Sequence, residues 1–405
     1  MLRRLSLQPV LRPLQTRGYA AAPKKTVAKK DNFKKTRSLG FKLKKAAPTE
    51  KKKISASAQV KPFRETVHRA GKIADASDLP AFGLETLKNA DPVVLSYQGA
   101  VSKACAIGGA FAPDRGFELL RERSTLLRKE SRDLFAALDA GNAKIVLAGP
   151  TKAGKRELVA QAMAYAQTKG WIVLPAPQML QYVNGTSDYA LTESGRLDLL
   201  RRNCEFFKKL ANSNAALGEA KLSQEYSFGP LKLTKDNSIL DLCKKGVSTR
   251  FQAGEIFEAV IHELSLLNTP VLQPVYAVDV LARNTEYRTP EYRQIKASEL
   301  QLAQLIKNPP MNFVQVLAPT GGNETEVALG SKPAEHFVYD PRFDSSVVQL
   351  LSSGTTIKVE PASSKETAVL MDYYKSRGLD VEKPEKLHVT SGGLLGELWR
   401  HVRAY

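Results

Sequence analysis

One short stretch constrains the fold of this chain more than any other. Residues 149–155 read Gly-Pro-Thr-Lys-Ala-Gly-Lys and match the pattern G-x-x-x-x-G-K. The apolar run of residues 143–148 precedes them and predicts a buried strand. Apolar residues then recur with helical spacing, at Leu158, Val159, Ala162, Met163 and Ala166. A strand, a glycine-containing loop and a helix in this order predict the phosphate-binding loop of a P-loop nucleotide-binding domain.

Each residue type in this loop suits the binding of phosphate. Glycines allow the backbone to turn so that several N–H groups face phosphate oxygens, and the following helix adds the positive end of its dipole. Lys155 is expected to reach the β- and γ-phosphates. The alternative is a glycine turn that binds nothing. The residues predicted to bind a nucleotide are Gly149, Pro150, Thr151, Lys152, Ala153, Gly154, Lys155, Arg156, Glu157 and Asp279.

Two positions depart from the pattern of an active nucleotide hydrolase. Arg156 stands at the eighth position, where a Ser or Thr normally ligates Mg²⁺. An arginine cannot ligate a cation, so it is expected either to contact phosphate or to point to solvent. The apolar residues 275–278 lead to Asp279, which is predicted to hold Mg²⁺ indirectly or else to cap a turn. Val280 follows where many ATPases carry a Glu, so no catalytic base is predicted.

The rest of the body predicts an α/β fold. Helices that alternate with apolar strands indicate a mostly parallel sheet covered on both faces. Residues 76–142 read as a loop followed by a helix. Thr320, after the predicted strand 313–317, is either a sensor of the γ-phosphate or part of a plain turn. Further helices are expected over residues 196–211, 252–267, 363–378 and in the stretch 387–405, and further strands over residues 171–174, 275–280 and 356–359.

The charge of the chain is concentrated at its N-terminus. Residues 1–53 hold 17 Lys and Arg against two acidic residues, which is +15 of the net charge of +19 and leaves +4 for the rest. Such an arm predicts contact with RNA, or alternatively a solvated tail. Residues 1–30 contain arginines and leucines but no acid, which is typical of a transit peptide for the mitochondrial matrix. The chain has no run of about 18 apolar residues, so no membrane span is predicted.

These features divide the chain into four predicted parts. Residues 1–19 are expected to form the transit peptide and residues 20–75 a basic, largely extended arm. Residues 76–360 are expected to form the P-loop domain, and residues 361–405 a small helical module.

Several stretches together resemble the death-associated protein 3 family of mitochondrial small-subunit ribosomal proteins, most closely its fungal members. They are residues 145–155, 171–175, 239–242 with 245–247, 274–279 and 391–405. The resemblance implies a P-loop domain of the AAA+-like class, a place in the head of the small subunit, and a bound purine nucleotide. That nucleotide is usually described as GTP or GDP in the family, while the sequence leaves ATP or ADP open.

The resemblance also assigns partners and site residues. It implies contacts with the mitochondrial small-subunit ribosomal RNA and with other mitochondrial ribosomal proteins, and no homo-oligomer. Gly149, Gly154 and Lys155 match the family's phosphate loop, and Asp279 matches its acidic strand end. Arg156 departs from the family's usual hydroxyl, which puts Mg²⁺ ligation and turnover in doubt.

Three functions compete at this point. The first is a structural ribosomal protein that holds a nucleotide with little or no turnover. The second is an active mitochondrial ATPase or GTPase of the AAA+-like kind, acting as a switch or remodeller. The third is an RNA-binding protein that never joins the ribosome. Arg156 and Val280 favour the first over the second.

Overall fold

The computed structural model describes residues 78–88, 91–111, 123–191, 197–337, 339–340, 343–379, 381 and 383–402. All of them belong to the compact unit of residues 61–405. The predicted transit peptide, and the predicted basic arm of residues 20–75, lie outside the described residues.

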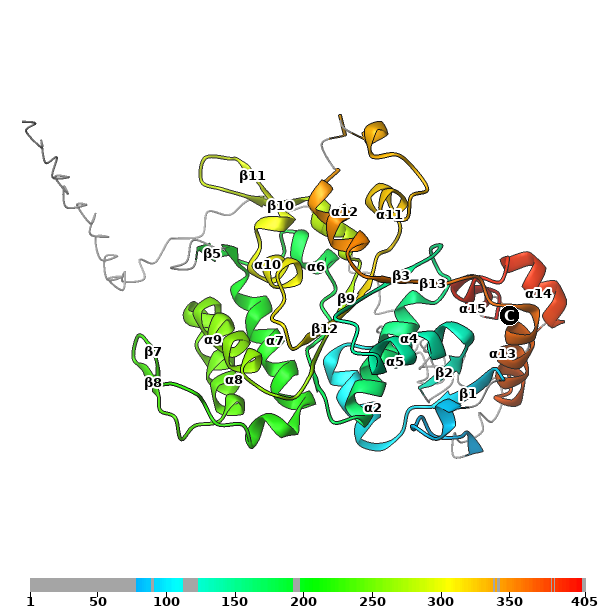
Figure 1. Cartoon of the computed structure of the whole chain (residues 1–405), viewed down its shortest axis with the longest axis horizontal. Helices are drawn as coiled ribbons and strands as arrows, with labels where there is room; N and C mark the ends of the chain where they lie inside the picture. Colours follow the sequence, from blue (N-terminus) through cyan, green and yellow to red (C-terminus); the bar gives the residue numbers. More distant parts are fainter. Residues whose placement is uncertain are drawn as a thin grey trace, which may run out of the picture. The chain divides into compact units, whose positions relative to one another are not determined.

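Five parallel strands form the central sheet of this unit (Figure 1). Because every pair in it is parallel, all carboxyl ends lie at one edge, where ligands bind in open α/β sheets. Listed across the sheet, the strands are β13 (Thr355–Lys358), β3 (Lys144–Ala148), β12 (Phe313–Ala318), β9 (Val271–Tyr276) and β4 (Ile172–Val173).

Both faces of this sheet are buried, which explains why its strands read as continuous apolar runs. In β3, Ile145 and Leu147 belong to the core on one face, and Val146 belongs to the core on the other. In β12, Val316 and Leu317 divide between the two cores in the same way. The alternation follows from the period of two in a strand.

Helices cover both faces. One core joins the sheet to α2 (Gly99–Gly108), α4 (Lys129–Asp139) and α5 (Lys155–Thr168). The other joins it to α7 (Leu200–Ser213), α8 (Ile239–Ser248), α9 (Ala253–Ser265), α10 (Gln301–Lys307) and α12 (Ser345–Ser352). The result is a sheet between two layers of helices.

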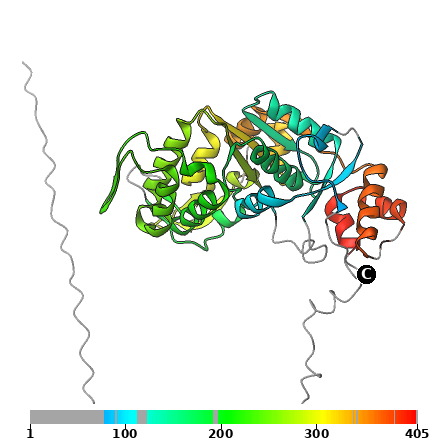
Figure 2. The ribbon, with the colours of Figure 1, turned by 90° about the horizontal axis from the view of Figure 1, so that it is seen from below.

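A third core lies beside the sheet. The C-terminal module consists of α13 (Ser364–Ser376), α14 (Pro384–Ser391) and α15 (Leu395–Val402), which lie together in Figures 1 and 2. They pack against an antiparallel ladder of β1 (Val93–Ser96) with β2 (Ser124–Leu127). Ser363 and Glu366 form the predicted capping box at the start of α13.

The remaining elements are short. They are α6 (Leu180–Val183), α11 (Asn323–Ala328), the antiparallel pairs β5 (Ala190–Leu191) with β6 (Leu197–Asp198), β7 (Tyr226–Phe228) with β8 (Leu231–Leu233) and β10 (Asn284–Arg288) with β11 (Gln294–Lys296), and the 3₁₀ turns η3 (Thr86–Lys88), η4 (Ala215–Gly218), η5 (Arg250–Gln252), η6 (Val278–Ala282), η7 (Ala297–Glu299) and η8 (Ala334–Phe337).

The predicted fold class, α/β with a parallel sheet flanked by helices and a small helical C-terminal module, is confirmed. Two local predictions were wrong. Residues 76–142 contain β1, α2 and β2 besides the expected helix, because their strand pairing joins distant residues and leaves no local periodicity. The strand predicted over residues 275–280 lies at Val271–Tyr276, because Ala277 adopts a left-handed conformation with φ of 55° and ends the extension. Within the described part, no helix is long and apolar enough to cross a membrane.

Candidate functional site

The loop of residues 149–155 runs from the end of β3 to the start of α5, as predicted. Steric constraints explain both glycines of this loop. A Cβ on Gly149 would stand 2.1 Å from the carbonyl oxygen of Val359, which follows β13. Gly154 has a φ of 107°, a conformation that side chains other than hydrogen disfavour. The backbone of the loop is therefore fixed from the side of β13 and by its own turn.

Lys155 begins α5 and turns back into the loop. Its Nζ donates hydrogen bonds to the carbonyl oxygens of Gly149 at 2.6 Å and Pro150 at 2.8 Å. The residue is 7% exposed. Burial lowers the pKa of Lys155, and the nearby charge of Asp279 opposes this shift. A buried ammonium group that bonds only carbonyls is well suited to accept an anionic partner.

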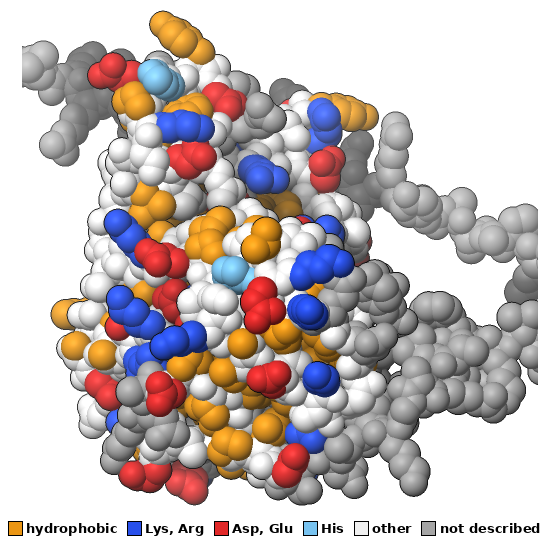
Figure 3. All heavy atoms as spheres, turned by 90° about the vertical axis from the view of Figure 1, so that its right-hand side faces the viewer, with side chains coloured by type: hydrophobic (Ala, Val, Ile, Leu, Met, Phe, Trp, Pro, Cys, Tyr) orange, Lys and Arg blue, Asp and Glu red, His pale blue; other side chains and the backbone are white. Residues whose placement is uncertain are grey.

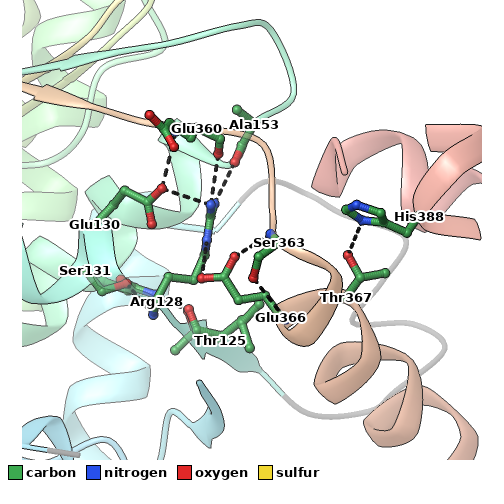
Figure 4. Close-up of polar contacts among 12 residues, drawn as sticks. Thr125, Arg128, Glu130, Ser131, Ala153, Glu360, Ser363, Glu366, Thr367 and His388 are labelled. Carbon is green, nitrogen blue, oxygen red and sulfur yellow. Dashed lines mark hydrogen bonds and ion pairs between the residues drawn. The ribbon is translucent and has the colours of Figure 1, made fainter. Parts of the chain in front are cut away.

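Arg128, between β2 and α4, holds the loop from outside (Figure 4). This side chain is 3% exposed. Its Nη1 donates to the carbonyl of Ala153 at 3.1 Å, and its Nη2 donates to the carbonyl of Glu360 at 2.9 Å and to Glu130 Oε1 at 3.0 Å. Its Nε lies 3.4 Å from Glu366 Oε1. One guanidinium thus joins the loop, the end of β13, α4 and α13.

The C-terminal module also contacts the loop directly. The backbone N–H of Gly396 donates to the carbonyl of Lys152 at 3.0 Å. The ammonium of Lys152 forms an ion pair with Glu397, and that hydrogen bond lowers the pKa of the carboxylate. Leu395 Cδ1 lies only 2.9 Å from where a Cβ on Gly154 would stand. The start of α15 therefore closes against the loop.

Asp279 lies at the same edge of the sheet, in η6 rather than at the strand end. Both of its carboxylate oxygens are used: Thr320 donates to them from its N–H at 2.7 Å and from its hydroxyl at 2.6 Å. The hydroxyl of Thr151 donates to the carbonyl of Thr320 at 3.2 Å. The structure thus brings Asp279 and Thr320 together with the phosphate loop, and it ties the ends of β9 and β12 to one another.

Arg156 is exposed, in line with one of its two expected positions, and it also contacts an aromatic ring. Its guanidinium carbon lies 5.0 Å from the ring centroid of Tyr276, which is a cation–π geometry. The residue is exposed, and the ring that it covers ends β9. Glu157 accepts a hydrogen bond from the hydroxyl of Tyr97 at 3.4 Å. The first residues of α5 after Lys155 therefore contact neighbouring aromatic side chains.

Glu324, in α11, is a further acidic residue at this edge that the sequence pattern missed. It is 7% exposed, and burial raises the pKa of its carboxyl group. One oxygen each of Glu324 and Asp279 lies within 4 Å of the point where a Cβ on Gly322 would stand. Val280, by contrast, is 1% exposed and packs in the core.

Arg128 was missed for a different reason. Its partners lie far along the chain, with 25 positions to Ala153 and 232 to Glu360, so no local pattern marks it. The available signal was weak: an arginine directly after an apolar strand, two residues before a glutamate.

A magnesium ion finds few ligands in this arrangement. Oxygen ligands are what Mg²⁺ requires, and Asp279 already accepts two hydrogen bonds while position 156 offers none. In the parts of the chain that the structure describes, no group of three or more His, Cys, Asp or Glu side chains is placed to hold a metal ion. The residues fit a phosphate group better than they fit a metal centre.

Comparison with known proteins identifies the family of this chain. The model of the family described as mitochondrial ribosomal death-associated protein 3 matches residues 125–400. The chain is 25% identical over 401 residues to the small ribosomal subunit protein mS29 of Neurospora crassa, covering 87% of this chain and 85% of that protein.

A solved structure, the Walker-type ATPase PABY2304 of Pyrococcus abyssi, is similar at 14% identity with a TM-score of 0.32. The match covers 67% of this chain and 64% of that one, which is less than two thirds of its length. The family match, in contrast, spans more than half of the chain and contains the phosphate loop, Asp279, Thr320 and most of the C-terminal module. The chain therefore belongs to the mitochondrial ribosomal death-associated protein 3 family.

Proposed function

We propose that this chain is a structural constituent of the mitochondrial small ribosomal subunit, in its head, and that its P-loop domain holds a purine nucleotide with little or no turnover. Family membership and the similarity to a small ribosomal subunit protein support the ribosomal part. The predicted transit peptide supports the mitochondrial matrix as the location. We also propose that the chain divides into four parts, with boundaries after residues 19, 75 and 360.

One observation carries the second half of this proposal. The loop of residues 149–155 has the features that bind phosphate, while Arg156 covers Tyr276 and offers no hydroxyl for a metal. Hydrolysis needs a stabilised metal and an activated water in addition to a bound phosphate. A site that binds phosphate, but neither stabilises the metal nor activates the water, holds a nucleotide better than it cleaves one.

The chain's own residues have separate parts in this site. The loop amides and Lys155 bind phosphate, with Lys152 and Thr151 at the rim of the loop, and Gly149 and Gly154 permit the turn. The phosphates of a bound nucleotide add negative charge beside the buried Lys155, on which the charge of Asp279 already acts. At 100 times its Kd, a nucleotide would stabilise the fold by about 2.7 kcal/mol.

The distribution of charge along the chain supports the proposed RNA and protein partners. The N-terminal arm carries most of the net charge and suits ribosomal RNA. On the face beside the C-terminal module, basic and acidic side chains are interspersed, with hydrophobic side chains between them (Figure 3). Such a mixed surface suits protein neighbours more than RNA, which requires clustered positive charge. We therefore propose contacts with the small-subunit RNA and with other ribosomal proteins, and no homo-oligomer.

The test uses native small subunits. Extraction and mass spectrometry should find a purine nucleotide in about one copy per tagged chain, and the same assay identifies guanine or adenine. A chain that sediments away from the small-subunit fraction in low salt would contradict the ribosomal role. Native subunits without nucleotide would contradict the nucleotide-holding role and leave the ribosomal role standing.

A second candidate, an active ATPase or GTPase, has one observation in its favour. Glu324 is buried beside Asp279, and its raised pKa is a property of many general bases. If this function is right, the purified chain hydrolyses GTP or ATP, and Glu324→Gln or Asp279→Asn lowers that activity at least tenfold, as loss of a general base does (10²–10⁴-fold as a rough range). We expect no turnover above background in any of the three proteins.

A further inference from the structure

Two successive carbonyl groups of the phosphate loop are held by donors from outside it. The carbonyl of Lys152 accepts from the N–H of Gly396 at 3.0 Å. The carbonyl of Ala153 accepts from Arg128 Nη1 at 3.1 Å. Neither donor belongs to the loop or to α5, and one of them belongs to α15.

These bonds fix the direction of the amide groups that bind phosphate. In a planar trans peptide, the N–H points opposite to the carbonyl of the preceding residue, and the described residues contain no cis peptide. When the carbonyls of Lys152 and Ala153 are held outward, the N–H groups of Ala153 and Gly154 point inward. The N–H of Ala153 indeed faces the carbonyl of Pro150 across the loop, at 3.3 Å.

Arg128 is suited to hold such a peptide because its own position is fixed. Its planar guanidinium is buried, donates hydrogen bonds to groups of Ala153, Glu130 and Glu360, and forms an ion pair with Glu366 (Figure 4). A guanidinium offers five donors in a rigid fork, whereas a lysine offers one compact ammonium. A lysine at this position cannot contact the four groups together.

We propose that Arg128 is a positioning residue of the phosphate loop, and that the C-terminal module completes the site through Glu366 and Gly396. The inference rests on the nucleotide-holding role proposed above. Arg128 acts through the backbone of the loop and does not touch the nucleotide. Because α13 and α15 hold the loop in its binding geometry, nucleotide binding and docking of the module form one coupled equilibrium.

The experiment compares three variants of the purified full chain. Arg128→Lys keeps the charge and removes the fork. Glu366→Gln keeps the capping box, which Gln also forms, and removes the charge that faces Arg128 Nε. Glu205→Gln is the control, because Glu205 is likewise a helical glutamate that pairs with arginine, but it lies on α7.

Three quantities are measured for each protein: the Kd of fluorescent GDP and ADP analogues, the Kd of inorganic pyrophosphate in competition, and hydrogen exchange of the amides of α15 with and without GDP. Arg128→Lys should weaken nucleotide and pyrophosphate by the same factor, on the order of tenfold, as expected for one hydrogen bond to a charged group. Glu366→Gln should give a smaller loss of the same kind, and Glu205→Gln none. GDP should slow hydrogen exchange of the α15 amides in the wild type. In the Arg128→Lys variant, GDP should leave the rate of this exchange unchanged.

A merely structural Arg128 predicts something else. The variants would then melt at lower temperature, yet bind nucleotide and pyrophosphate as tightly as the wild type, and α15 would exchange at the same rate with and without GDP. That result overturns the inference. If the Arg128→Lys variant does not fold, the binding data of the Glu366→Gln variant decide between the two outcomes, because this variant keeps the capping bonds of α13 and is expected to fold.

The proposed function and this inference fail in different ways. Wild-type protein that binds no nucleotide overturns the proposed nucleotide-holding role, and with it the inference. Wild-type protein that binds nucleotide, together with Arg128→Lys and Glu366→Gln variants that bind equally well, overturns the inference alone.

Discussion

The carboxyl edge of the sheet has two sides that are built differently. On one side, the phosphate loop of residues 149–155 is contacted by Arg128, by Val359 after β13 and by the start of α15. On the other, Asp279 and Thr320 bond to one another, with Glu324 beside them. The loop is shaped by residues from distant parts of the chain, whereas Asp279 and Thr320 bond to one another and reach the loop through the hydroxyl of Thr151. This difference supports the proposal that the site holds a phosphate and does not cleave one.

The same substitution on each side gives the largest expected contrast. Gly149→Ala places a Cβ 2.1 Å from a backbone oxygen, whereas a Cβ on Gly322 meets its nearest atoms at 3.6 and 3.9 Å. Gly149→Ala should lower the free energy of unfolding by about 3 kcal/mol, the upper end for overpacking, and Gly322→Ala by less than about 1 kcal/mol. Urea unfolding of both variants measures this. Equal losses would show that the two sides are equally rigid.

The variant Lys155→Ala tests the loop side through its affinity for nucleotide. Removing the buried ammonium should weaken GDP and ADP by about a hundredfold, the upper range for a charge-assisted hydrogen bond. Lys169→Ala, at the other end of α5, is the control, since that lysine pairs with Asp139 at the surface. Titration of fluorescent analogues gives both numbers. An unchanged Kd in Lys155→Ala would mean that the loop is not the phosphate site.

Asp279→Asn tests the acidic side in the same assay. Asparagine keeps one acceptor for Thr320 and loses the charge, so we expect a Kd within about threefold of the wild type and a modest loss of stability of about 1 kcal/mol. A loss as large as that of Lys155→Ala would place Asp279 in the holding site. The two sides would then work as one.

The dependence of binding on pH gives the smallest effect. A phosphate favours the charged form of Lys155, so affinity is complete below the pKa of this lysine in the free protein and falls as pH rises through it. Burial lowers that pKa, so the decline should begin below the ordinary lysine value of about 10.4. The Lys155→Arg variant stays charged, so its affinity for nucleotide should be constant from pH 7 to 10. A wild-type affinity that is equally constant over this range would contradict a lowered pKa of Lys155.

Local patterns predicted the parts of this molecule that local sequence determines. The strand before Gly149, the helix after it and the capping box at Ser363 are confirmed, because apolar spacing and capping act within a few residues. Residues 149–155 were placed correctly between them. Their binding of a nucleotide stays a prediction.

What the sequence did not predict depends on contacts between distant residues. The pairing of β1 with β2 and the burial of Arg128 require partners that no window of the sequence contains. The end of β9 was placed too late because Ala277 and Val278 are apolar and continue the pattern, although the backbone has already turned. The contact of the exposed Arg156 with the ring of Tyr276 was also not predicted, because it depends on a neighbouring strand.

The ion pair of Lys152 with Glu397 joins positions 245 residues apart, and the bond of Arg128 to the Glu360 carbonyl spans 232. Closing loops of this length costs chain entropy, and contacts between such distant residues slow folding. A ribosome that is translating this chain exposes residues 149–155 long before it has made the residues that shape them. A product truncated before residue 360 retains the complete glycine motif and Arg128, yet lacks Glu360, Glu366 and Gly396. Under the proposed coupling, a chain without its C-terminal module should retain nucleotide less well than the complete chain.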